Sequence, residues 1–186
     1  MNYDMYMVVY EKNKKRLENY DRIKQVLPSL KKFKAIDSIN EKNNSIKINE
    51  KNNFNTDKIV NDKLKGKLGC NLSQQILWMN HLKNDKDWLL ILEDDTEIFV
   101  NNSSIFDEKI NKLIDFADKN NSNFIQLEVR NHHLKEQIKY PQTEIKNLYI
   151  MKPQCGMSAY LINKKAINYF FNLLPWEKYI DIYTSD

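Results

Sequence analysis

The sequence is poor in several features that define common protein classes. It has two cysteines, Cys70 and Cys155, in 186 residues. They are too few for a cysteine metal cluster, and their apolar or glycine-flanked surroundings predict buried thiols rather than a disulfide. The three glycines include two in residues 65–70, which do not match the GxxxxGK[ST] pattern of a nucleotide-binding loop. No apolar run approaches the ~20 residues of a membrane helix. No signal-peptide pattern precedes the first predicted strand, so we expect a cytoplasmic protein.

The bulk composition is typical of a soluble globular domain. Hydrophobic residues make up 41% of the chain and charged residues 29%, which excludes a disordered polymer. The length suits one domain over residues 1–186. The net charge of +4 comes from scattered lysines without interleaved aromatics, so the sequence predicts a solvated lysine-rich surface and no nucleic-acid partner.

Apolar periodicity predicts strands that alternate with helices. Strands are expected at residues 5–9, 33–36, 88–92, 124–127, 148–151 and 158–162, and helices near 17–27, 73–82, 110–117 and 164–174. Gly66 and Gly69 predict a turn before a helix capped by Ser73. A polar excursion is expected at about 38–58, and a loop at 131–145. The alternation favours an α/β fold with a mostly parallel central sheet, which binds ligands at the carboxyl ends of its strands.

The apolar run that begins at Trp88 ends in three consecutive carboxylates, Glu93, Asp94 and Asp95. Three like charges repel one another unless a cation or strong hydrogen-bond donors compensate them. In an extended segment, Glu93 and Asp95 project to the same side and could share one divalent ion that also binds substrate phosphates. Alternatives are a Walker-B-like strand, which lacks its phosphate loop here, and a receiver or phosphatase pocket, whose acids belong near the first strand. The acids could also simply end a strand.

Two blocks with a short helix between them resemble the family 25 glycosyltransferases, which include lipooligosaccharide and collagen galactosyltransferases. The first is Gly-Cys-Asn-Leu-Ser-Gln-Gln-Ile-Leu-Trp at 69–78, and the second is the apolar strand that ends in Glu-Asp-Asp at 93–95. Weaker similarities lie at residues 5–16, 35–37, 156–166 and 180–183. The resemblance therefore extends over almost the whole chain.

The resemblance implies a GT-A-like (Rossmann-related) fold, a UDP-sugar donor and Mn²⁺ or Mg²⁺. The implied reaction is inverting transfer of a hexose, galactose or glucose, to a hydroxyl of a glycan or glycosylated side chain, as in lipopolysaccharide biosynthesis. A peripheral membrane contact is compatible with such an acceptor. Glu93 and Asp95 are the candidate metal ligands. The general base is left open among Asp94, Glu128 and Asp181.

Four further residues are candidate donor contacts: Arg16, Asp37, Ser73 and Gln74. The first three also have a simpler structural interpretation. Arg16 could be a surface arginine, Asp37 a turn residue and Ser73 a helix cap. Gln74 stands where the family usually has histidine, Ser38 replaces a family glycine, and the chain ends soon after its last similar segment.

Two alternatives to an active transferase are open, of which these departures motivate the first. One is a degenerate relative that binds a nucleotide sugar or glycan without turnover. The other is a non-enzymatic α/β interaction module.

Overall fold

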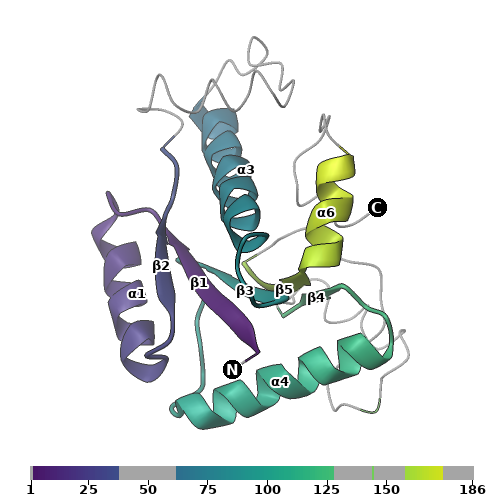
Figure 1. Cartoon of the computed structure of the whole chain (residues 1–186). Coiled ribbons are helices and arrows are strands. Elements are labelled where there is room, and N and C mark those ends of the chain that lie inside the picture. The colour runs from purple at the N-terminus through teal and green to yellow at the C-terminus, as the bar shows by residue number, and fades with distance from the viewer. Residues whose placement is uncertain (1, 38–61, 128–143, 145–157, 174–186) are drawn as a thin grey trace, which may run out of the picture.

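The computed structural model describes residues 2–37, 62–127, 144 and 158–173. Within them, a five-stranded sheet has the order β2-β1-β3-β5-β4 and carries helices on both faces (Figure 1). The strands are β1 (Tyr3–Val9), β2 (Lys31–Lys34), β3 (Trp88–Glu93), β4 (Phe124–Gln126) and β5 (Ala159–Asn163). The helices are α1 (Lys14–Val26), α3 (Asp62–His81), α4 (Ser103–Lys119) and α6 (Lys164–Asn172). The predicted strand at 148–151 and most of the two predicted loops lie outside the described residues.

The sheet is mixed rather than mostly parallel. β1 pairs in parallel with β2 and with β3, whereas β5 pairs antiparallel with both β3 and β4. Apolar periodicity locates strands but carries no information on their direction, so the prediction missed the reversal at β5. The parallel register sets Val8 opposite Glu93, and the carboxyl ends of β1 and β3 therefore meet at one edge of the sheet.

Two hydrophobic cores lie on opposite faces of the sheet because alternate strand residues point to opposite sides. One face of β1 and β3, which includes Met5, Met7 and Leu90, packs against α1 and α4. The other face, which includes Leu89 and Ile91, packs against α3 and α6. Figure 1 shows these two helix pairs as separate layers around the sheet. The resulting three-layer arrangement confirms the predicted α/β class.

Asparagine side chains begin three of the helices. Asn13, Asn102 and Asn163 each have an extended backbone; the first two each accept from two backbone N–H groups of the first turn, and Asn163 accepts from one. This satisfies donors that have no partner inside the helix. The predicted Asn163 cap is confirmed, as is the end of α1 before Pro28, since proline cannot continue a helix.

The predicted turn between Gly66 and Gly69 is wrong, and so is the helix cap at Ser73. Both glycines lie inside α3, a continuous helix of 20 residues. A helical glycine costs only about 1 kcal/mol, which tertiary packing overrides. Ser73 therefore sits in the helix interior, where its hydroxyl donates to the Gly69 carbonyl (2.7 Å) and accepts from the Ile36 N–H (2.9 Å).

A polar network is buried between α3 and β5. The Trp78 indole N–H donates to the Tyr160 hydroxyl (3.1 Å), which donates to Oε1 of Gln74 (2.6 Å). All three residues are fully buried. Burial also raises the pKa of Tyr160 well above its usual value, so the hydroxyl stays neutral and can donate.

We expect Tyr160→Phe to lower the free energy of unfolding by about 1–3 kcal/mol, because it removes two buried hydrogen bonds without changing the ring. Tyr169→Phe, at an exposed position on α6, is the matched control and should change stability by under about 0.5 kcal/mol. Urea unfolding of both variants measures the difference. Equal stability of the two variants would contradict the role of the network.

His81, at the end of α3, is a buried titratable group. Its Nε2 lies 3.1 Å from the Asp87 carbonyl, and its Nδ1 lies 3.4 Å from Asp4 Oδ2. Burial lowers the pKa of His81, although the Asp87 carbonyl and the Asp4 carboxylate act in the opposite direction; Lys164 reinforces the lowering. The folded protein therefore takes up this proton at a lower pH than the unfolded chain does.

We expect the free energy of unfolding to fall as the pH drops below about 6.5, because the unfolded state binds the His81 proton first. His81→Gln should flatten this dependence, whose slope for one proton is at most about 1.4 kcal/mol per pH unit. Urea unfolding of both proteins between pH 7 and about pH 5 tests it. An unchanged slope in the variant would assign the pH dependence to other groups.

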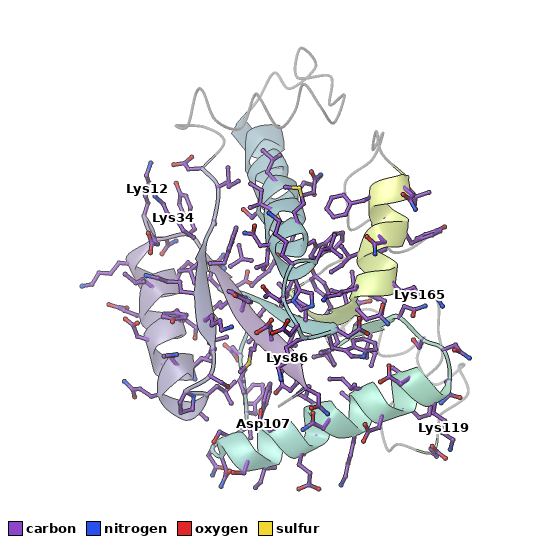
Figure 2. All side chains as sticks on the ribbon, in the orientation of Figure 1. Lys12, Lys34, Lys86, Asp107, Lys119 and Lys165 are labelled. Atoms are coloured by element: carbon purple, nitrogen blue, oxygen red, sulfur yellow. The ribbon has the colours of Figure 1, made fainter. Side chains whose placement is uncertain are left out.

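Within the described ranges, no helix combines the length and the apolar character needed to cross a lipid bilayer. Figure 2 shows the labelled lysines Lys12 and Lys34 at one corner of the molecule and Lys119 and Lys165 at the opposite side. This distribution agrees with the predicted scatter of lysines over the surface.

Candidate functional site

A cleft of about 420 Å³ opens at the carboxyl ends of β1 and β3. Its walls come from four other places: the first turn of α1, the chain after β2, the middle of α3 and the residues after β3. The lining residues are Val8, Tyr10, Arg16, Ala35, Ile36, Asp37, Gly69, Cys70, Ser73, Glu93, Asp94 and Asp95. The volume falls within the range of small-molecule sites. The predicted position of the site, at the carboxyl edge of the sheet, is therefore confirmed as the position of a cleft.

Glu93 is the last residue of β3, and it enters the cleft while its backbone remains in the sheet. Its N–H donates to the Ser158 carbonyl just before β5 (2.7 Å). The Cys70 thiol donates to its Oε1 (3.4 Å). Cys70 is exposed and lines the cleft, so its predicted burial is wrong. The prediction rested on the apolar or glycine-flanked surroundings of the cysteines, whereas the continuous helix α3 carries Cys70 on its cleft side.

Asp94 holds the end of β1 and the start of α1 together. The Tyr10 N–H donates to Oδ2 (2.7 Å), and Arg16 Nη1 donates to Oδ1 (2.5 Å). Only 12% of the Asp94 side chain is exposed. Both carboxylate oxygens are thus engaged by strong donors inside the protein.

Asp95 shares the same guanidinium but faces solvent. Arg16 Nη1 lies 2.9 Å from Asp95 Oδ2, and 52% of the Asp95 side chain is exposed. Burial by itself would lower the pKa of Arg16, but the two aspartates outweigh it and raise the pKa. A single cation therefore compensates two of the three adjacent carboxylates.

The backbone of the acidic segment is fixed from two sides. Asn19 on α1 donates through Nδ2 to the carbonyls of Asp94 and Thr96, each at 3.0 Å. The Thr96 hydroxyl donates to the Ser158 carbonyl (2.7 Å). The carboxylates consequently project from a rigid platform. Asn19 carries no sequence signal that distinguishes it from other surface asparagines.

The opposite wall of the cleft is organised by Asp37. This residue is buried, and its Oδ2 accepts from Lys12 Nζ (2.6 Å) and from the Tyr10 hydroxyl (3.3 Å). The backbone of the preceding residue, Ile36, is held by Ser73 of α3. Tyr10 thus links the two walls, since its N–H binds Asp94 while its hydroxyl binds Asp37. Tyr10 was not among the predicted site residues; its position directly after a predicted strand was the signal that could have indicated it.

The structure brings together most of the predicted site residues. Arg16, Asp37, Ser73, Glu93, Asp94 and Asp95 all line the cleft. Gln74 does not line it, because its side chain belongs to the buried network with Tyr160. Glu128 and Asp181 lie outside the described residues.

The side chains at the cleft can be tested for their fit to the divalent ion that the family resemblance implies. Within the described ranges, no three His, Cys, Asp or Glu side chains gather closely enough to hold a metal ion by themselves. Glu93 and Asp95 offer two carboxylates at the cleft, and hard cations such as Mg²⁺ are commonly held by one or two carboxylates together with substrate phosphates and water. The residues present therefore fit an ion that is completed by its substrate.

Comparison with known proteins assigns the chain to a family. A profile described as glycosyltransferase family 25 (LPS biosynthesis protein) matches residues 3–184. The chain belongs to glycosyltransferase family 25. Membership indicates a glycosyltransferase, with a sugar donor and an acceptor, and associates it with lipopolysaccharide biosynthesis. None of the curated proteins compared with the chain matches it.

The two aspartates of the acidic segment should differ in how much their mutation lowers the free energy of unfolding. We expect Asp94→Ala to lower the free energy of unfolding by about 2–3 kcal/mol, since hydrogen bonds to a shielded charged group are lost. Asp95→Ala should cost under about 1 kcal/mol, because its ion pair is solvent-exposed. Urea unfolding of the two variants measures the difference; a larger loss for Asp95→Ala would contradict the assignment.

Proposed function

We propose that this family 25 member transfers a hexose, galactose or glucose, from a UDP-sugar to a hydroxyl of a glycan or glycosylated side chain. The transfer inverts the anomeric centre and is assisted by Mn²⁺ or Mg²⁺, on a GT-A-like fold. The observation that carries this proposal is the cleft in which Glu93 and Asp95 lie beside Arg16 at the carboxyl edge of the sheet.

Charge explains why a diphosphate suits this cleft. Glu93 and Asp95 would hold the ion, which would supply positive charge to stabilise the departing nucleoside diphosphate. Arg16 adds a guanidinium, whose planar fork matches phosphate oxygens. Asp37 and Tyr10, on the other wall, offer a carboxylate and an aromatic ring to the nucleoside.

The general base has to be an available carboxylate near the acceptor hydroxyl. Asp94 suits this role poorly, because Arg16 and the Tyr10 N–H engage both of its oxygens and stabilise its charged form. Its contacts support an anchoring role instead. Glu128 and Asp181 are then the remaining candidates for proton abstraction.

A binder without turnover is the second candidate function, and residue 74 was its main motivation. Gln74 does not line the cleft and bonds Tyr160, so the exchange of a family histidine for glutamine falls in the buried contact between α3 and β5. This placement weakens the case for lost catalysis, and we favour the active enzyme.

Calorimetric titration with UDP, UDP-galactose and UDP-glucose, with and without Mn²⁺, tests the proposal. We expect Mn²⁺-dependent binding, which Asp95→Asn should weaken at least about 100-fold, since ligand contacts of this kind are worth several kcal/mol. Asp115→Asn, at an exposed position on α4, is the control for charge loss and should bind as the wild type does.

Release of UDP in the presence of Mn²⁺ then distinguishes an enzyme from a binder. Slow donor hydrolysis by the wild type but not by Asp95→Asn supports turnover. Absence of any Mn²⁺-dependent nucleotide binding would refute both candidate functions.

A further inference from the structure

We propose that Arg16 is a resident counter-ion of the acidic segment, which keeps a metal ion off Asp95 until the donor diphosphate offers the guanidinium another anionic partner. This inference rests on the proposed function and extends it to the order in which the ligands bind. The observation behind it is that one nitrogen, Arg16 Nη1, contacts both Asp94 and Asp95.

The ion pair puts Arg16 and a metal in competition for the same carboxylate. Asp95 Oδ2, one of the two carboxylate oxygens that a cation shared with Glu93 could bind, lies 2.9 Å from Nη1. A divalent ion arriving alone would have to displace the guanidinium or bind within repulsive distance of it. Either event costs free energy, so the metal affinity of the nucleotide-free protein should be low.

Asp94 keeps Arg16 in place when the guanidinium releases Asp95, so that the Arg16–Asp95 ion pair can form again. It is the more shielded of the two aspartates, with 12% of its side chain exposed against 52% for Asp95. Its second oxygen is fixed by the Tyr10 N–H. When the bond to Asp95 breaks, Arg16 therefore remains tethered through Asp94 at the wall of the cleft.

A guanidinium can serve two anions at once. It carries five N–H donors in a planar fork, so some can keep Asp94 while others turn to a phosphate oxygen. The Arg16 side chain is 35% exposed and lines the cleft, so the released donors face the ligand. The diphosphate then compensates both the guanidinium and the ion, and metal and nucleotide should each strengthen the binding of the other.

Two substitutions separate this role from a purely structural one. Arg16→Gln removes the charge, and Arg16→Lys keeps a charge but replaces the fork by a single point donor. Lys15→Gln, on the neighbouring exposed residue, is the matched control for loss of one positive charge from the same turn of α1. Titration of Mn²⁺, followed by the electron paramagnetic resonance signal of the free ion, gives the affinity with and without UDP.

We expect Arg16→Gln to bind Mn²⁺ alone about tenfold more tightly than the wild type, since a contacting positive charge is gone. Lys15→Gln should differ from the wild type by less than about twofold, because solvent screens its charge. UDP should raise the Mn²⁺ affinity of the wild type more than that of either Arg16 variant. Mn²⁺ alone should also raise the melting temperature of Arg16→Gln more than that of the wild type.

The outcomes are distinguishable from failure of the proposed function. If UDP binds the wild type with Mn²⁺ while Arg16→Gln binds Mn²⁺ alone no better than the wild type, the counter-ion role is overturned and the donor site stands. If the wild type binds no UDP, the proposed function fails, and with it the release step. If Arg16→Gln does not fold, Arg16→Lys decides: an undiminished effect of UDP on its Mn²⁺ affinity overturns the proposal.

Discussion

The structure around the cleft depends on compensation of the negative charge at the end of β3. Three carboxylates in a row would repel one another and the nearby end of the sheet. Arg16 and the backbone N–H of Tyr10 meet this constraint from a segment that lies 78 and 84 residues away in the sequence. The same contacts join β1, α1 and β3 at one point, so charges that line the cleft also hold the architecture together.

This compensation divides the acidic segment by environment rather than by residue type. Asp94 is shielded from solvent, and both of its carboxylate oxygens accept hydrogen bonds, so it contributes to the stability of the fold. Asp95 is exposed and shares its cation, and Glu93 enters the cleft from the last position of the strand. A site of this kind holds its charges on a rigid base while leaving the outermost one exchangeable, as expected where a ligand must bring its own counter-charge.

Local sequence patterns predicted those parts of the fold that local forces determine. The apolar run into Glu93, the helical spacing in α4 and the asparagine before α6 located their elements because burial and capping act within a few residues. Strand direction, the continuity of α3 through Gly66 and Gly69, and the pairing of Arg16 with Asp94 depend on tertiary contacts. These contacts join residues far apart in the chain, so no short stretch of sequence reveals them. The exposure of the Cys70 thiol was missed for the same reason.

Helix α3 separates residue 74 from the residues that line the cleft. Gly69, Cys70 and Ser73 face the cleft, whereas Gln74, Leu77 and Trp78 face the second core. Neighbouring positions 73 and 74 thus belong to different environments, because successive helical residues point about 100° apart. Residue 74 therefore acts on the site only through the packing of α3 on β5. The bond between Gln74 and Tyr160 there ties α3, which forms one wall of the cleft, to β5.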